Sequence, residues 1–589
     1  MKKRMSLLLA LMLLTITVLA ACGGGKTAEQ PPSQGEQQET TPPAEGNGEE
    51  TTEPPAEGQD ESQGYFEAED PSANPSAALN RKDTLVVGMT APKGVFNPFY
   101  WQTAYDRFVV DAIFDSFFSL NGDGTYNNRL AESVEVSEDK LKYTFKLKPG
   151  VTYSNGDPVT VKDYAFAMKV LHDKSYDGQS DIMSVNIKGG KEYHDGKANE
   201  ISGIKVIDDN TIEIEVTEAN AMTKDNLGTI FFVPESVYGK DYKQGDLEYM
   251  KNLHAKPIGS GQYVLKSFSP GQEVVLEANP NYFLGAPKIK NVIYKTTTDE
   301  TKLAMFQSGE IDMDMVTVNE DNVEALKEMG FLDINIFPTN GYGYVALNHK
   351  DPKFQDVKVR QALLYGLNRA EIVEIIYGPY ANVINVPQSS ESWAYTNEGI
   401  EPYEFDIEKA KQLLDEAGWV PGADGIREKD GKKLDIHFSA TADNPVIDAL
   451  IPIMTQNYQE LGIKLTTETL DFNAIMDKKD KGEFEMFFAA WGLTPDPDST
   501  VYITDGQQND IGFSNPEYDA AMKKGLNAFD LEERKAAYAE AYQALNKNVP
   551  DLPIYQRRDA WAINSRLNGV DITPYKNFAI DLYKAEIQQ

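Results

Sequence analysis

The second half of the chain repeats one pattern, in which a capped helix stops at a glycine and a strand follows. Asp406 can cap a helix that ends at Gly418, because its carboxylate can accept hydrogen bonds from the free N–H groups of the first helical turn. A helix that starts at Asn444-Pro445 stops at Gly462, and the strand IKLTTETL follows at once. Helices that alternate with strands pack as layers, so this region predicts an α/β lobe.

The earlier part of the chain is rich in strands. TLVVGM (84–89) reads as a short apolar strand, and LKYTFKLK (141–148) alternates apolar and polar residues, as a half-buried strand does. A turn at 208–210 predicts a second hairpin, and a helix is expected near 160–171. LPIYQ (552–556) is a last strand that can return to the first part of the chain.

Composition excludes several classes of function. The 589 residues carry a net charge of −36, which disfavours nucleic acid, since binding to phosphates needs clustered Lys and Arg. The single cysteine excludes an internal disulfide framework and a cysteine-based zinc site. The five histidines are scattered, and the motif Ser137-x-x-Lys140 falls in a turn before an exposed strand. We therefore expect no enzyme activity, no cofactor and no bound metal.

The amino terminus has the pattern of an export signal. Lys2, Lys3 and Arg4 precede an apolar run that is too short to span a membrane comfortably and that ends in LAAC. LAAC resembles a bacterial lipobox, which implies a signal peptide at 1–21 and lipidation of Cys22. Residues 22–80 are acidic and rich in Pro and Glu, with TTPPAEG recurring as TTEPPAEG, so we expect a disordered linker without secondary structure.

Six segments in order carry a resemblance to one family. They are AESVEVSEDKLKYTFKLKPGVTYSNGDPVTVKDYAFAM (131–168), IGSGQYVLKSF (258–268), NPNYFLGAPKIKNVIYKTTTDETKLAMFQSGEIDM (279–313), NHKDPKFQDVKVRQALLYGLNRAEIV (348–373), KAKQLLDEAGW (409–419) and DGIREKDGKKL (424–434). The chain from residue 83 to its end resembles the family 5 extracellular solute-binding proteins, the oligopeptide- and dipeptide-binding lipoproteins of bacterial ABC importers.

The resemblance implies a fold and partners. The fold would be α/β and two-lobed, like a periplasmic binding protein of type II, cluster C, with an extra strand-rich subdomain. Lobe I would comprise 83–120, 258–346 and 553–589, with the subdomain inserted at 121–257, and lobe II would comprise 347–552. A monomer, lipid-anchored on the outer face of the cytoplasmic membrane of a Gram-positive-type cell, would deliver short peptides to a permease heterodimer and its ATPases.

Two alternatives to peptide import stay open. The same fold can bind another solute, such as an oligosaccharide or a metal chelate. The chain can also serve as a peptide sensor or pheromone receptor that passes its ligand to signalling machinery.

Aromatic segments are the candidate binding residues. NPFYW places Phe99, Tyr100 and Trp101 in a loop after the first strand, where they form either a core plug or a wall of the ligand cleft. The resemblance places this segment at the cleft. Trp393 lies in an irregular polar stretch, and Tyr555 lies near an expected crossing between the lobes, where hinge packing and ligand contact are equally plausible.

The strand FEMFFAAWGLTPDPDST (484–500) carries the first candidates, Trp491, Gly492 and Leu493. The resemblance implies that an extended ligand pairs with this strand end through its backbone, as in β-augmentation. Peptide binders of the family place an aspartate three residues after the tryptophan to hold the ligand's α-amine. This chain has Thr494 there, so Asp496 or Asp498 would have to substitute, unless Asp496-Pro497 only forms the turn that closes the strand.

Overall fold

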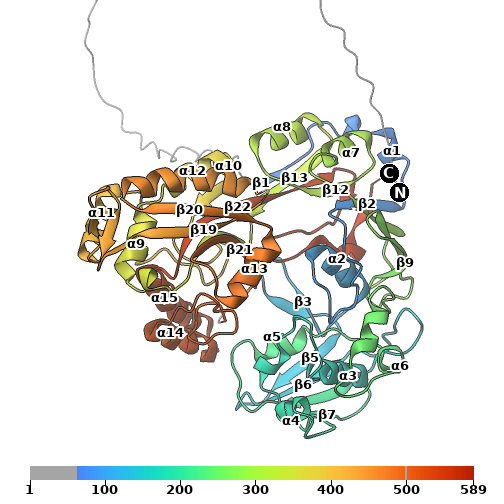
Figure 1. Ribbon diagram of the computed structural model, residues 1–589. Helices are drawn as coiled ribbons and strands as arrows, with labels where there is room; N and C mark the ends of the chain where they lie inside the picture. The colour runs from blue at the N-terminus through green and yellow to red at the C-terminus, as the bar shows by residue number, and fades with distance from the viewer. Residues whose placement is uncertain (1–62, 443, 498–499, 589) are drawn as a thin grey trace, which may run out of the picture. The chain divides into compact units, whose positions relative to one another are not determined.

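The computed structural model describes residues 63–442, 444–497 and 500–588; the expected signal peptide, Cys22 and most of the expected linker lie outside them. The largest element is a mixed sheet of 13 strands (Figure 1). Its main strands in spatial order are β20 (Lys464–Leu470), β19 (Asp435–Thr441), β21 (Met486–Gly492), β14 (Gly341–Leu347), β22 (Asp551–Asn564), β12 (Met313–Val316), β2 (Thr84–Met89), β11 (Asn291–Thr296), β10 (Glu273–Ala278) and β9 (Tyr263–Ser269).

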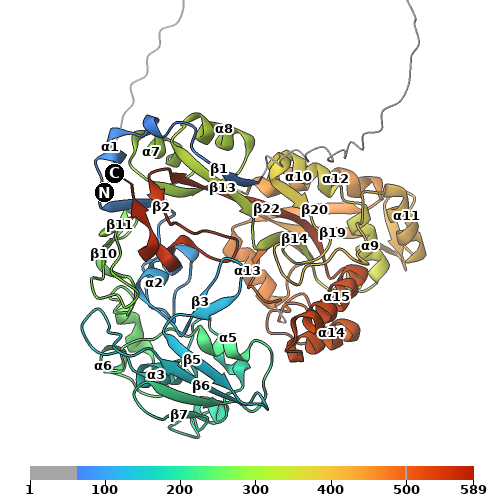
Figure 2. The same cartoon turned by 180° about the vertical axis from the view of Figure 1, so that it is seen from behind.

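Two connections join the two halves of this sheet. The first residues of β22 pair with β14, and its last residues pair with β13 (Leu332–Pro338) and β12 (Figure 2). β13 continues into β14 after only Thr339 and Asn340. The two-lobed α/β prediction is thus confirmed, with β13–β14 and β22 as crossings. The proposed limits of each domain stay a prediction; β14, most of which was assigned to lobe I, pairs with β21 of lobe II.

The lobe I sheet is covered on both faces. Leu85 and Val87 of β2 belong to one core with α2 (Ala104–Ile113). Val86 points the other way, into a core with α7 (Lys302–Ser308) and α8 (Glu320–Glu328). A strand buried on both faces is apolar throughout, which explains the run TLVVGM.

The inserted subdomain contains the expected strand-rich sheet. Tyr143, Phe145 and Leu147 of β6 are buried and alternate with exposed or half-buried residues, as their pattern predicts. The antiparallel sheet and its helices are β5 (Ala131–Val136), β6 (Lys142–Leu147), β8 (Thr211–Glu215), β7 (Ile204–Val206), α3 (Val161–Leu171), α4 (Gly190–His194), α5 (Thr223–Gly228) and α6 (Glu235–Tyr238).

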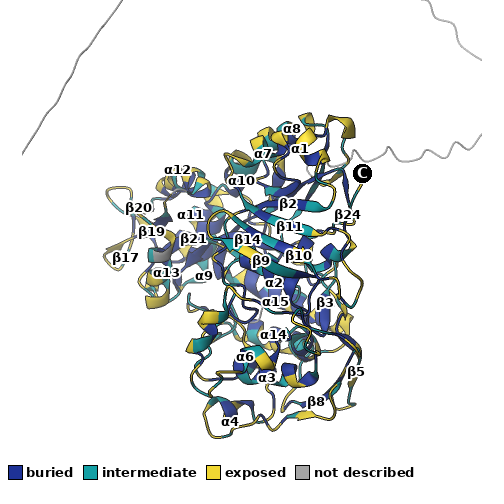
Figure 3. Ribbon diagram, turned by 90° about the vertical axis from the view of Figure 1, so that its right-hand side faces the viewer, coloured by how far each residue is buried: buried dark blue, intermediate teal, exposed yellow. Residues whose placement is uncertain are grey.

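Lobe II is layered as its capping pattern predicts. The Asp406 side chain accepts from the Lys409 N–H at the start of α11, and Asn444 caps α12. One face of the sheet carries α9 (Val357–Tyr365), α10 (Arg369–Tyr377), α11 (Ile407–Glu416) and α12 (Pro445–Glu460); the other carries α13 (Phe472–Lys481), α14 (Pro516–Asn527) and α15 (Leu531–Asn548). The central strands of both lobes are mainly buried (Figure 3).

The expectation of an unstructured linker is wrong for residues 64–79. β1 (Gly64–Phe66) pairs antiparallel with β13, and α1 (Ser76–Leu79) follows. The edge of β13 offers unpaired backbone groups, and Asp333 accepts hydrogen bonds from the Tyr65 hydroxyl (2.8 Å) and the Ala68 N–H (2.9 Å). Composition averaged over the whole segment concealed this short extended stretch.

Arg360 and Arg369 are structural residues whose buried side chains bind backbone carbonyls. The Arg360 guanidinium donates to the backbone carbonyls of Phe354 and Asn548, and Arg369 donates to those of Ile384 and Pro553. Each arginine thus links its helix to neighbouring backbone segments through hydrogen bonds.

Within the described ranges, no helix has the length and apolarity needed to cross a bilayer.

Candidate functional site

The carboxyl end of β21 leaves part of its backbone unpaired. Leu493 N–H donates to Asn340 O (2.9 Å) and Asn348 N–H donates to Glu485 O (3.0 Å), which fixes the register between β14 and β21. In an antiparallel ladder alternate residues bond to the same neighbour, so the N–H and C=O groups of Ala490 and Gly492 point to the other edge.

That other edge is open at the strand end. β19 pairs with β21 at Met486 and Phe487 and nowhere later in the described ranges. Ala490 and Gly492 are exposed, and a methyl group added at Gly492 would meet no atom within 4 Å. Exposed N–H and C=O groups on a strand edge are a template for another extended chain.

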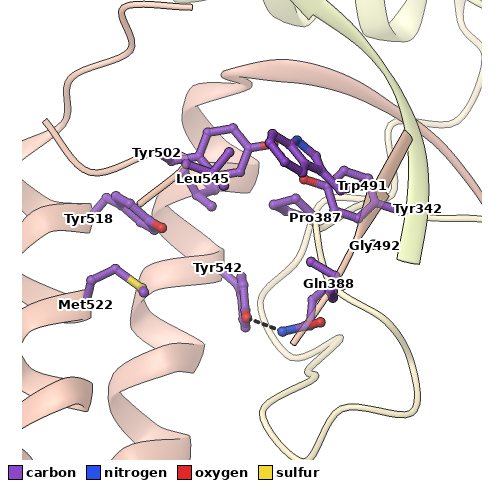
Figure 4. Close-up of a pocket in the computed structure, with 12 residues that line it drawn as sticks. Tyr342, Pro387, Gln388, Trp491, Gly492, Tyr502, Tyr518, Met522, Tyr542 and Leu545 are labelled. Carbon is purple, nitrogen blue, oxygen red and sulfur yellow. Dashed lines mark hydrogen bonds between the residues drawn. The ribbon is translucent and has the colours of Figure 1, made fainter. Parts of the chain in front are cut away.

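Trp491 covers one face of this strand end. Its indole stacks on Tyr344, with ring centroids 6.3 Å apart and planes 6° apart. It also borders a narrow pocket whose cavity volume is about 20 Å³, room for about one water molecule (Figure 4). Besides Trp491, the lining comprises Tyr342, Pro387, Gln388, Gly492, Leu493, Val501, Tyr502, Tyr518, Met522, Tyr542 and Leu545. Trp491, Gly492 and Leu493 all line this pocket, and their role in ligand binding stays a prediction.

The loop after β21 uses its polar groups internally. The Thr494 hydroxyl donates to the backbone carbonyl of Asp496 (2.7 Å). The Asp496 carboxylate forms an ion pair with Arg534 of α15, whose side chain is mostly buried. Asp496 therefore already has a cationic partner, and its suggested role as the site of a ligand amine stays a prediction. Asp498 lies outside the described residues.

Trp393 packs in lobe II beside the same arginine. The Arg534 guanidinium lies 4.7 Å from the Trp393 ring centroid, and Tyr538 meets this ring edge-on. Trp393 is half-buried, so its contact with Arg534 and Tyr538 explains the tryptophan without a ligand.

The lobe I aromatic loop separates into core and surface. Phe99 and Tyr100 are 5% and 8% exposed, and Tyr100 packs on Tyr176 and His254. Of the three, only Trp101 is not fully buried; it is half-buried, with the Arg107 guanidinium 5.1 Å from its ring centroid. The structure favours the core-plug interpretation for Phe99 and Tyr100.

Tyr555 lies on the face of the sheet opposite Trp491. It belongs to the core with α9 to α12, and its ring packs on Tyr377 (5.0 Å between centroids) and approaches Phe488. Its hydroxyl accepts from that of Tyr377 (3.3 Å). Of the two interpretations that the sequence left open, this packing favours hinge packing.

A buried acid, Asp551, lies behind the pocket, and no sequence motif indicates it. The Tyr502 hydroxyl donates to Asp551 and is hydrogen-bonded to the Tyr342 hydroxyl (2.9 Å). Burial raises the pKa of Asp551 to about 7, although the hydrogen bond from Tyr502 opposes this rise.

The inserted subdomain touches lobe II near the open strand end. The Ala221 N–H donates to the Leu526 carbonyl (2.8 Å), and Lys140 lies 5.7 Å from the Phe529 ring centroid. These contacts join segments that are hundreds of residues apart in the chain.

Within the described ranges, no cluster of three or more His, Cys, Asp or Glu could hold a metal ion.

Sequence comparisons identify a family and its relatives. Residues 125–512 match the model of the bacterial extracellular solute-binding proteins, family 5. The chain is 27% identical to the oligopeptide-binding protein AppA of Bacillus subtilis over 516 residues, 85% of this chain and 90% of that protein. It is also 27% identical to heme-binding protein A of Haemophilus influenzae over 468 residues, 76% of this chain and 82% of that one.

A solved structure has the same fold. AppA of Bacillus subtilis in complex with a nonapeptide superimposes with a TM-score of 0.73 at 25% identity, covering 86% of this chain and 99% of AppA.

Proposed function

Since the chain belongs to the family 5 bacterial extracellular solute-binding proteins, we propose that it captures short peptides between its lobes and delivers them to an ABC importer. The observation that carries this proposal is the open edge of β21 at Ala490 and Gly492. A peptide in extended conformation can pair with these backbone groups whatever its side chains are, so affinity would depend little on ligand sequence.

The proposal agrees with what the relatives bind. AppA is described as an oligopeptide-binding protein, and its structure holds a nonapeptide. Family 5 proteins serve transport and not catalysis, and they act outside the cytoplasm. The finer assignments, a permease heterodimer with its ATPases and a monomeric receptor, belong to this proposal.

Replacing Ala490 with proline tests the backbone-pairing proposal directly. Proline removes the N–H that faces the open edge, while the ladder to β14 uses other residues. Ala490→Pro should lower affinity for a nonapeptide at least about 10-fold in calorimetry, since one backbone hydrogen bond is lost and the ring crowds the ligand. Ala490→Val keeps the N–H and is the matched control. Equal affinity of the proline and valine variants would refute pairing at this edge.

The identity of the solute has its own experiment. Mass spectrometry of compounds released from the denatured, purified protein should detect peptides. A second candidate, a haem-like or other chelate ligand, is favoured by the equal identity to heme-binding protein A. Release of such a compound without peptide would replace the peptide assignment.

We also propose anchoring through a lipid on Cys22, from the LAAC pattern. A Cys22→Ser variant should be shed from the membrane or remain unprocessed. Full membrane retention of a cleaved Cys22→Ser protein would contradict the anchor.

A further inference from the structure

The loop 573–577 of lobe I packs against the loop of the inserted subdomain that faces the end of β21. The Thr573 hydroxyl donates to the Gly122 carbonyl (2.9 Å). A Cβ built on Gly124 would lie 3.3 Å from Tyr575 Cδ2 and 3.4 Å from Pro495 Cβ. Gly124, with φ +82°, therefore adjoins both Tyr575 of lobe I and Pro495 of lobe II.

The Tyr575 hydroxyl is buried at this junction. Within the described ranges it has no hydrogen-bond partner. Burial, with the negative charge of Glu391 in lobe II, raises the pKa of Tyr575 to about 12. The phenol is therefore neutral at physiological pH and can both donate and accept a hydrogen bond. A buried hydroxyl without a partner costs free energy, so its presence needs an explanation.

A second polar atom without a partner lies at the same strand end. The side-chain Nδ2 of Asn340 donates a hydrogen bond to the Leu493 carbonyl (2.8 Å). The Oδ1 atom of the same side chain is buried and unpaired within the described ranges. Asn340 adjoins Leu493, and Tyr575 reaches Pro495 through Gly124. The side chains of Asn340 and Tyr575 thus both lie beside residues 493–495, the segment that follows the open edge.

We propose that Tyr575 is a ligand-binding residue, whose hydroxyl hydrogen-bonds a backbone amide or carbonyl of the peptide that pairs with the end of β21. The inference rests on the proposed function and adds a contact from lobe I. The Tyr575 ring belongs to lobe I, whereas Pro495, which adjoins the same glycine, and Glu391, whose charge acts on the hydroxyl, belong to lobe II, so a change in the separation of the lobes gives the ligand access. A peptide backbone supplies the matching donors and acceptors at every residue.

The variant Tyr575→Phe separates this role from a structural one. It removes only the hydroxyl and keeps the ring against Gly124. With a nonapeptide selected by the wild-type protein from a random pool as probe, affinity should fall about 5- to 20-fold. The melting temperature of the protein without probe should stay equal or rise, because the lost hydroxyl had no partner.

Tyr458→Phe is the matched control. The Tyr458 hydroxyl donates to the Leu363 carbonyl (3.1 Å) in the core of lobe II that lies on the face of the sheet opposite Trp491. Its loss should lower the melting temperature and leave probe affinity unchanged.

Two outcomes would overturn the proposal. One is unchanged probe affinity in Tyr575→Phe. The other is a fall in melting temperature as large as that of Tyr458→Phe, which would reveal an internal partner. If no nonapeptide binds the wild-type protein, the proposed function fails independently of the role of Tyr575. The same variants are then measured with hemin as the probe. The comparison of melting temperatures still tests whether the Tyr575 hydroxyl has an internal partner.

Discussion

The Arg534 guanidinium forms an ion pair with the Asp496 carboxylate, linking α15 to the turn that follows the open strand end. Their side chains are 11% and 18% exposed, so each charge depends on the other for solvation. This ion pair fixes the position of the turn. It also neutralises the Asp496 carboxylate, the group that would otherwise be available to bind the α-amine of a ligand.

Asp496→Asn should destabilise the protein by about 2–3 kcal/mol, because it leaves the mostly buried Arg534 without its counter-charge. Chemical denaturation followed by circular dichroism measures the change. Asp505→Asn, at an exposed position, is the control and should change stability by less than about 0.5 kcal/mol. A loss no larger than that of the control would mean that the ion pair contributes nothing.

A free amino terminus on the ligand should matter little. Because Asp496 is paired and Thr494 carries no charge, a nonapeptide and its N-acetylated form should bind with affinities within about 3-fold of each other. Thr494→Asp should create a preference of at least about 10-fold for the free amine, since it adds an exposed carboxylate at the strand end. Strong discrimination by the wild-type protein would contradict the role assigned to Asp496.

A disulfide should form between cysteines introduced at Ala221 and Leu526. The hydrogen bond between their backbones (2.8 Å) puts the two residues within disulfide range. The test uses a Cys22→Ala background, which removes the only native thiol. We expect rapid cross-linking, read by mass, and peptide release slowed at least about 10-fold until reduction. Lys205→Cys with Lys523→Cys, both exposed, is the control pair. Cross-linking no faster than in this pair would refute the contact.

Stability should decrease from about pH 4 to pH 7 through Asp551. Its pKa is raised from the ordinary 3.8 to about 7 by burial, so the folded protein holds a proton that the unfolded chain has already lost in this range. Stability from this group is full below the unfolded pKa and is lost as pH rises through the folded one. Asp551→Asn cannot lose a proton, so its stability relative to wild type should rise between pH 4 and pH 7. A constant difference across this range would refute the raised pKa.

Local signals predicted the layers well. Asp406 and Asn444 cap the expected helices, and TLVVGM forms the expected strand, because caps and periodicity act within a few residues. Trp491 is a candidate because it lies near the end of a hydrophobic strand and because that segment resembles a known family.

The rest of the site depends on contacts that are distant in the chain. Arg534 meets Asp496 from 38 positions away, and Asp551 lies behind Tyr502. An aromatic loop such as NPFYW has the same composition whether it fills a core or lines a cleft, so Phe99 could not be placed by sequence alone. No sequence motif includes Tyr575. Only the burial of its unpaired hydroxyl in the described part of the structure indicates a role in binding.

The pairing of β1 with β13 determines where a pull on the amino terminus acts. Gly64 lies opposite Ile336, two residues before β13 ends at Pro338 and the chain crosses to lobe II. A force applied at Gly64 acts close to the crossing from β13 to β14, about which the lobes would rotate. Its lever arm about this crossing is short, so it has little effect on the angle between the lobes. With the proposed lipid anchor on Cys22, tension on the chain before Gly64 would therefore rotate the protein as a whole and leave the separation of the two lobes unchanged.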